Sequence, residues 1–209
     1  MSQFWYAAFS EDFVGQAQKI FKKLDKDVIV TVWDPELVPE MLRRGVSVIL
    51  GRGATALRIR KVVDLPVVEI PIPFEDMADT LIEASRYGRN IGVIGYNNLL
   101  SGLECLNPIL NVSIRQIFAV DENDTYHQIQ KLKNEGIDVI VGGLLQTHYA
   151  RELGLPAVRI ELTDKSLSYA CQEAEKLIAT VKAATRKAEE LKTILNTTNE
   201  KYVAVDIKG

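Results

Sequence analysis

Residues 45–53 read GVSVILGRG, and residues 136–144 read GIDVIVGGL. In each segment glycines enclose an apolar run, and a Leu-Pro pair with a second apolar run follows later in the chain. Gly45 and Gly136 hold the same position, where each would end the preceding helix in the left-handed conformation that glycine adopts without steric cost. The chain therefore contains an internal repeat of one structural unit.

The correspondence extends over an ordered series of positions. The further matching pairs are Val48 and Val139, Ile49 and Ile140, Gly51 and Gly142, Leu65 and Leu155, Pro66 and Pro156, Val68 and Val158, and Ile70 and Ile160. Each proline would begin a strand, where its missing N–H does little harm. One lobe architecture used twice explains this order better than coincidence does.

Short Val/Ile-rich runs alternate with amphipathic stretches, which is the pattern of parallel βα units. The expected strands are 4–8, 28–32, 47–50, 67–70, 91–94, 113–119, 138–141 and 157–160. The expected helices are 11–23, 35–44, 54–62, 74–87, 99–106, 125–135 and 144–153, with a long final helix from about Asp164. Because the strands are apolar throughout, the sheets should be covered on both faces.

The predicted fold is therefore α/β, with two doubly wound lobes, a ligand cleft between them and a long C-terminal helix. Each lobe should hold a parallel sheet of about four strands flanked by helices. We expect the first lobe at residues 1–88, the second at 89–162, a crossover and connecting helix at 163–195, and the start of a following domain at 196–209.

The composition limits the classes of protein. The 209 residues are 47% hydrophobic and 25% charged, which is ordinary for a globular protein with a core. The net charge is −3 and the sequence contains no run of basic residues, so it shows no sign of a basic surface that would bind nucleic acid. The first residues lack the charged start and long apolar stretch of a signal peptide, and no stretch reaches the ~20 apolar residues needed to span a bilayer. We expect a cytoplasmic protein without a membrane partner, in which Cys105 and Cys171 are buried free thiols.

Ligands of open parallel sheets bind beyond the carboxyl ends of the strands. The loops expected there are FSED (9–12), WDPE (33–36), GRGAT (51–55), GYNN (95–98) and GGLLQT (142–147). Arg52 lies beside a helix N-terminus, where a guanidinium suits a carboxylate or phosphate. Thr55 offers a hydroxyl there, although its simplest role is within the first helical turn. The spacings of a dinucleotide fingerprint and a phosphate loop are absent, so tight turns alone remain an equal explanation for the glycines.

Catalysis finds little support. No Cys/His cluster has metal-ligand spacing and no serine has the setting of a nucleophile elbow. His127 is expected on a solvated helix face, whereas a cleft position stays open for His148. Helix capping is the better explanation for the acidic residues at the strand-to-helix turns, Asp12, Asp34 and Glu36. We expect no enzyme, no cofactor and no metal.

The C-terminal third has the apolar seam of a coiled coil. From Leu167 the apolar positions alternate by three and four at Ala170, Ala174, Leu177, Val181, Ala184, Ala188, Leu191 and Leu195. The part at 167–181 should pack on a lobe. Beyond about residue 182 the helix has a strongly charged face and too little apolar surface to be buried in a core. We interpret this part as a connecting helix that pairs with a second copy. We therefore expect a homodimer formed through this helix.

A family resemblance adds to this interpretation. The segments VILGRGATALRIRKVVDLPVVEIPIPFEDM, NIGVIGYNN and VIVGGLLQTHYARELGLPAVRIEL resemble the N-terminal receptor domain of propionate-catabolism-regulator-type activators, which are sigma-54-dependent bacterial transcription factors. The resemblance covers about residues 1–185 and implies two lobes around a ligand cleft, with the last helix crossing back to the first lobe. LNTTNEKYVAVDIKG resembles the linker and first strand of a PAS domain. The resemblance further implies an ATPase module contacting sigma-54 RNA polymerase and a DNA-binding helix-turn-helix module, both outside these residues.

The candidate ligand-binding residues follow from these loops and the resemblance. They are Gly51, Arg52, Gly53, Ala54, Thr55, Tyr96, Asn97, Gly142, Gly143, Gln146 and Thr147. Members for propionate breakdown respond to 2-methylcitrate, a tricarboxylate that needs several cationic or N–H partners. The other glycine loops here lack a second arginine, so a smaller or less charged metabolite is plausible. The resulting prediction is a sensor domain for a small anionic metabolite, and the alternative is an enzyme on a chelatase- or racemase-like scaffold.

Overall fold

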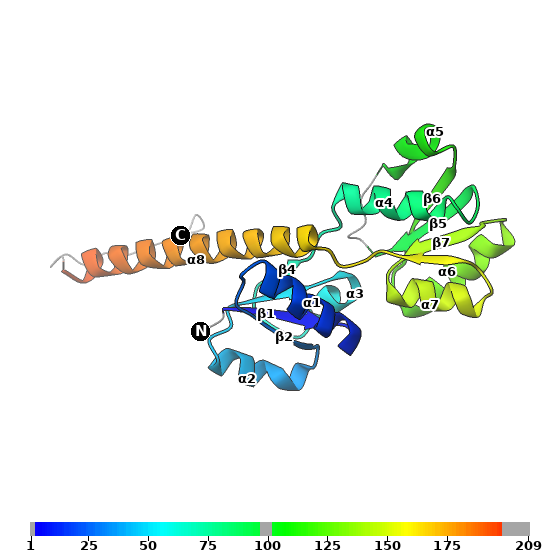
Figure 1. Ribbon diagram of the computed structural model, residues 1–209. Coiled ribbons are helices and arrows are strands. Elements are labelled where there is room, and N and C mark those ends of the chain that lie inside the picture. Colours follow the sequence, from blue (N-terminus) through cyan, green and yellow to red (C-terminus); the bar gives the residue numbers. More distant parts are fainter. Residues whose placement is uncertain (1–2, 97–101, 198–209) are drawn as a thin grey trace, which may run out of the picture.

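The computed structural model describes residues 3–96 and 102–197, with side-chain surroundings up to residue 194. Two parallel four-stranded sheets have the orders β2-β1-β3-β4 and β6-β5-β7-β8 (Figure 1). The first sheet consists of β1 (Phe4–Ala8), β2 (Val28–Val32), β3 (Val48–Gly51) and β4 (Val67–Glu69). The second consists of β5 (Asn90–Gly95), β6 (Ser113–Phe118), β7 (Val139–Gly142) and β8 (Ala157–Arg159). The sequence repeat is thus a repeat of topology, and the predicted α/β class with two doubly wound lobes is confirmed.

Helices cover both faces of each sheet. The α-helices are α1 (Glu11–Lys23), α2 (Val38–Arg43), α3 (Gly53–Ile59), α4 (Phe74–Ala84), α5 (Asn107–Leu110), α6 (Glu122–Asn134), α7 (Leu144–Glu152) and α8 (Asp164–Thr197). Two 3₁₀ turns are η1 (Pro35–Leu37) and η2 (Leu103–Leu106). None of the helices in the described part of the chain combines the length and apolar character that a membrane crossing requires.

Helix boundaries differ from expectation at several places. The expected helices 54–62 and 74–87 end earlier, at Ile59 and Ala84. The expected helix 35–44 is split into η1 and α2, since Pro39 in the first turn of α2 has no N–H to donate. The expected helix 125–135 begins earlier, at Glu122, because the Asp121 carboxylate caps it by accepting from the Asp124 N–H at 2.8 Å. Of the expected helix 99–106, residues 99–101 lie outside the described residues.

Successive residues of each strand point to opposite faces of the sheet, so each sheet contributes to two hydrophobic core clusters. In the first sheet Tyr6 and Leu50 pack under α1 and α8, whereas Trp5 and Ile49 pack under α2 and α3. The second sheet has the same arrangement, with one cluster under α4 and one under α6 and α7. Covered faces on both sides explain why the strands are apolar at every position rather than at alternate ones.

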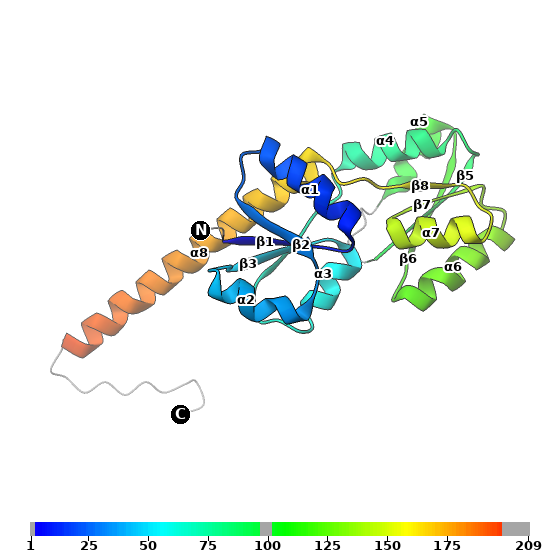
Figure 2. The same cartoon turned by 60° about the horizontal axis from the view of Figure 1, so that its bottom comes forward.

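Two helices cross between the lobes, one in each direction. After β4 the chain leaves the first sheet, and α4 buries Met77, Leu81 and Ala84 against the second sheet. After β8 it returns, and α8 packs on the first sheet beside α1 (Figures 1 and 2). By packing, α4 therefore belongs with the second lobe although it precedes residue 88, the end that we expected for the first lobe.

The long helix α8 has two parts. Its first turns are buried in the first-lobe core, where Leu177 and Ile178 make the last apolar contacts. From residue 179 to 194 every side chain is exposed, and the helix projects away from both lobes (Figure 2). The projecting part includes the seam that we expected to pair with a second copy.

The two helix-ending glycines have the predicted conformation. Gly45 has φ of +83° and Gly136 has φ of +81°. After Gly45, the Val46 N–H donates to the Met41 carbonyl at 3.0 Å, and after Gly136 the Ile137 N–H donates to the Leu132 carbonyl at 3.1 Å. These bonds satisfy carbonyls that the helix end leaves free, and they turn the chain directly into β3 and β7.

We predict that Gly136→Ala lowers the free energy of unfolding by about 1–2 kcal/mol, because a Cβ disfavours the left-handed backbone. A Cβ at Gly136 meets nothing within 4 Å, so a clash would not contribute. The matched control is Gly15→Ala inside α1, where a Cβ also meets nothing. It should instead stabilise by up to about 1 kcal/mol through helix propensity. Urea unfolding measures both, and equal effects at the two sites would contradict the backbone explanation.

Candidate functional site

A cavity of about 110 Å³ lies where the carboxyl ends of the central strands of both sheets open. Its lining from the first half of the chain is Tyr6, Ala7, Phe9, Phe13, Arg52, Gly53, Ala54, Thr55 and Ile72. Its lining from the second half is Ile94, Gly95, Tyr96, Glu122, Gly143, Leu144, Leu145, Gln146 and Ile160. The loops after β3 and β7, which are equivalent in the repeat, therefore contribute to one cavity. The volume holds several water molecules or a small metabolite.

The candidate residues divide into those that line the cavity and those behind it. Lining positions are Arg52, Gly53, Ala54, Thr55, Tyr96, Gly143 and Gln146. Gly51, Gly142 and Thr147 do not line it, and Asn97 lies outside the described residues. Thr147 is fully buried, with its hydroxyl 3.0 Å from the carbonyl oxygens of Gly143 and Leu144. Its hydroxyl therefore serves the start of α7.

Gly51 and Gly142 have a packing role at the ends of their strands. A Cβ on Gly51 would lie 3.1 Å from the Cα of Ala56, and one on Gly142 would lie 2.5 Å from the Cβ of Gln146. The carbonyl of Gly51 accepts from the Ile70 N–H, and that of Gly142 from the Ile160 N–H, each at 2.8 Å. The glycines thus let each following helix approach its strand and hold the segment that crosses between the lobes.

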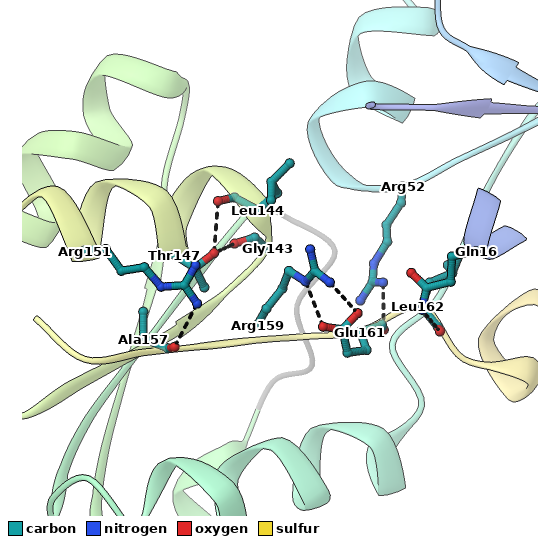
Figure 3. Close-up of polar contacts among 10 residues, drawn as sticks. All are labelled: Gln16, Arg52, Gly143, Leu144, Thr147, Arg151, Ala157, Arg159, Glu161 and Leu162. Atoms are coloured by element: carbon teal, nitrogen blue, oxygen red, sulfur yellow. Dashed lines mark hydrogen bonds and ion pairs between the residues drawn. The ribbon is translucent and has the colours of Figure 1, made fainter. Parts of the chain in front are cut away.

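Arg52 brings a positive charge into the cavity. It precedes α3 in an extended conformation, and its Nη1 donates to the Glu161 carbonyl at 2.9 Å (Figure 3). Among the described residues it forms no ion pair, and this hydrogen bond is to a neutral carbonyl, although the carboxylates of Asp76 and Glu161 lie near enough to favour its charged form. Burial lowers the pKa of Arg52, while Tyr6, Asp76 and Glu161 act in the opposite direction. Burial also raises the pKa of Tyr6 to about 12, so Tyr6 is neutral at physiological pH.

A second arginine lies near Arg52, and the sequence of the loops did not predict it. Arg159, at the end of β8, holds the Glu161 carboxylate through Nε at 2.8 Å and Nη2 at 3.0 Å (Figure 3). Its guanidinium also lies 5.5 Å from the centre of the Phe13 ring on α1, so it contacts the first lobe. The sequence-based expectation was that the glycine loops contain one arginine. Arg159 lies outside those loops, at the last position of β8. Its charge is already paired.

The second-lobe wall provides polar groups without partners. Tyr96 is 8% exposed, and its buried hydroxyl has no hydrogen-bond partner among the described residues. Gly143 begins α7 in an extended conformation and has no side-chain cap. The first N–H groups of a helix lack intrahelical partners, and those of α7 belong to residues that line the cavity. This wall therefore offers hydrogen bonds that a bound anion would complete.

The two lobes touch each other around the cavity. Arg58 on α3 forms an ion pair with Glu122 at the start of α6. Ala54 and Leu57 pack against the second-lobe cluster, and Leu144 packs against the first-lobe cluster. These contacts place α3 and the start of α7 against the opposite lobe, next to the cavity.

Groups for catalysis are not gathered at this site. The ionisable lining residues are Arg52, Glu122 and two tyrosines, and no set of His, Cys, Asp and Glu within the described residues has the geometry for a metal ion. His148 is exposed near Glu152 rather than lining the cavity. Asp34 caps η1 by accepting from the Glu36 N–H at 2.9 Å. Among the described lining residues, no nucleophile lies beside a base.

The cysteines differ from expectation in one respect. Cys171 is buried between α8 and the first sheet, and burial raises its pKa to about 11. Cys105 is exposed in η2, so the prediction of two buried thiols is wrong for this residue. The thiol of η2 faces outwards because the apolar contacts there are made by Leu103 and Leu106.

Comparison with known proteins agrees with this geometry. The sequence profile of the propionate catabolism activator family matches residues 34–184. An NtrC family transcriptional regulator from Clostridium acetobutylicum superposes with a TM-score of 0.71 at 24% identity, over 86% of this chain and 97% of that chain. At that identity the superposition shows a shared fold. A lac repressor bound to ONPG matches with a TM-score of 0.34 at 14% identity, over 74% of this chain and 62% of that chain, which is too distant to support an argument.

The family match runs from just after β2 into the exposed part of α8. It takes in the cavity-lining loops after β3, β5 and β7 and both crossings between the lobes, but not the lining residues before residue 34. The chain belongs to the propionate catabolism activator family of transcriptional regulators.

Proposed function

We propose that this chain is the ligand-sensing receptor domain of a sigma-54-dependent transcriptional activator. It binds a small anionic metabolite in the cavity between the lobes and signals through α8. We divide the chain into lobes at residues 1–88 and 89–162, with α4 packed on the second lobe, a crossover and connecting helix at 163–195, and the start of a PAS-like domain at 196–209. DNA, ATP and sigma-54 RNA polymerase are contacted by modules outside these residues. The observation that carries the proposal is the unpaired charge of Arg52 in a cavity lined from both lobes.

The charge favours an anion for a physical reason. A half-buried guanidinium loses part of its hydration, and one hydrogen bond to a carbonyl replaces only some of that loss. A carboxylate can accept two parallel N–H bonds from the same guanidinium and neutralise it. The free N–H groups at the start of α7 face the same space from the other lobe. A bound anion would thus hold both lobes together.

The test is a thermal-shift screen with carboxylates and sugar phosphates, since ligand that binds only the folded state raises the unfolding temperature. Arg52→Ala should weaken a hit by about 1.5–3 kcal/mol, the value of a hydrogen bond to a charged group. The control is Arg60→Ala, an exposed arginine at the end of the same helix that pairs with Glu69. Undiminished affinity in Arg52→Ala, or an equal loss in both variants, would contradict the role given to Arg52.

The root of α8 is in contact with both lobes. Asp164 pairs with Lys23 of α1, and Glu175 pairs with Lys26 just after it. On the other side Lys165 pairs with Glu75 at 3.0 Å, and the Thr163 hydroxyl donates to Asp76 at the start of α4. Because α4 packs on the second sheet, a change in the angle between the lobes would act on the first turn of α8. Ligand that favours the closed cavity would therefore favour one position of this helix.

We predict that ligand changes the position of α8 relative to the first lobe. Labels at Lys61→Cys, Lys131→Cys and Leu191→Cys report on the first lobe, the second lobe and the helix, and distances between them are measured by spin-label spectroscopy. The background is Cys105→Ser, whereas Cys171 stays unlabelled because it is buried with a pKa of about 11. Lobes that close while the distance from residue 61 to 191 stays constant would make α8 a passive tether.

The exposed part of α8 is proposed to pair with a second copy. Its seam contains Ala184, Ala188 and Leu191, and Leu191 is 54% exposed. A seam so short and so rich in alanine provides little apolar area, and short helices are marginal without further contacts. The isolated domain should therefore dimerise weakly, and the modules that follow would add contacts in the whole regulator.

We predict that oxidation cross-links two copies of an Ala188→Cys variant at high protein concentration, in the Cys105→Ser background. Arg186→Cys is the matched control, because residue 186 lies on the opposite face of the helix. Sedimentation should show mostly monomer at low micromolar concentration. Cross-linking of both variants at the same rate would indicate random collision and would contradict pairing along the seam.

A further inference from the structure

We propose that the cavity selects an organic monocarboxylate with an apolar body, and not a polycarboxylate or a phosphate ester. This inference rests on the proposed sensing function and narrows the ligand class. Three observations carry it: the number of unpaired charges around the cavity, the apolar character of the remaining wall, and the unpartnered hydroxyl of Tyr96.

The charges around the cavity leave one cation for a ligand. Arg159 holds the Glu161 carboxylate with two hydrogen bonds, and Arg58 holds Glu122. Arg52 is then the one arginine at the cavity without an ion pair among the described residues. The carboxylates of Glu122, Glu161 and Asp76 lie in the same region and would repel further negative charge. A single carboxylate finds its partner here, whereas the second and third charges of a tricarboxylate would remain unpaired at high cost.

The rest of the wall suits an apolar body. Ile72, Ile94, Leu144 and Ile160 line the cavity with the ring of Phe13. Phe9, at the end of β1, also lines it and is 41% exposed. A hydrocarbon chain or ring on the ligand would cover this exposed ring and remove apolar surface from water on both partners. Each buried methylene group strengthens binding by about fourfold.

Two residues on opposite walls are the candidates to hold the polar end of such a ligand. Arg52 lines the cavity from the first lobe, and Tyr96, whose hydroxyl is buried without a partner among the described residues, lines it from the second. A buried hydroxyl without a partner is unusual in a folded protein, and a carboxylate oxygen would accept its hydrogen bond. The carboxylate would thus join Arg52 to Tyr96, and the apolar body would extend along Phe9 and Phe13.

The test measures dissociation constants by calorimetry for the straight-chain carboxylates from acetate to octanoate, for phenylacetate, and for citrate and inorganic phosphate. Affinity should rise about fourfold for each methylene until the cavity is filled and then fall. Citrate and phosphate should bind more weakly than the best monocarboxylate. Tyr96→Phe, which removes only the hydroxyl, should weaken that acid by about three- to tenfold.

A pair of phenylalanine variants tests the apolar wall. Phe9→Ala should reduce the gain per methylene without abolishing binding of the shortest acids. Phe118→Ala is the control, because Phe118 is similarly exposed at 44% but does not line the cavity. A gain per methylene that both variants leave unchanged would overturn the placement of the apolar body.

The outcomes separate this inference from the proposed function. Binding of citrate or phosphate that depends on Arg52 and exceeds every monocarboxylate would overturn the inference and leave an anion sensor standing. Failure of every monocarboxylate to bind at millimolar concentration would overturn the inference as well. Tight binding that Arg52→Ala does not affect would contradict the proposed anion site itself.

Discussion

The packing of α8 on the first sheet is the contact on which the rest of this structure depends. The chain reaches α8 from β8 of the second sheet, yet Leu167, Ala170 and Ala174 are buried in the first-lobe core. In the opposite direction α4 leaves the first sheet and is buried on the second. Each lobe therefore completes its core with a helix whose connection comes from the other lobe. Each lobe would expose an apolar sheet face to water if its crossing helix were removed.

The two crossing segments also decide where the cavity lies. Ile70 and Ile160 follow β4 and β8 and donate to the carbonyls of Gly51 and Gly142, respectively. These bonds bring the crossing segments past the loops that begin α3 and α7, so both loops line one space. Arg52 then reaches the Glu161 carbonyl on the second crossing segment. The cavity, the crossing segments and the first turn of α8 thus form one connected set of contacts, through which the proposed signal would pass from ligand to helix.

Charge is distributed unevenly around that cavity. Arg159 and Arg58 use their charges within the protein, the first on Glu161 and the second on Glu122 across the lobes. Arg52 does not, and burial already disfavours its charged form. A bound carboxylate would pair with the charge of Arg52 at the point where both lobes meet. Binding and closure would then be favoured by the same interaction.

The sequence by itself determined the repeated βα pattern, the helix-ending glycines at 45 and 136, and the position of Arg52 at the start of a helix. These features depend on local geometry: strand and helix periodicity and the backbone freedom of glycine are written in neighbouring residues. The tertiary structure alone decided that α4 packs on the second sheet, that Arg159 lies beside Arg52, and that the Tyr96 hydroxyl is buried without a partner among the described residues. An amphipathic helix shows which of its faces is buried but not against which sheet, and a charge at a strand end shows its sign but not its neighbours. Those choices are made by contacts between residues far apart in the chain, and no local pattern encodes them.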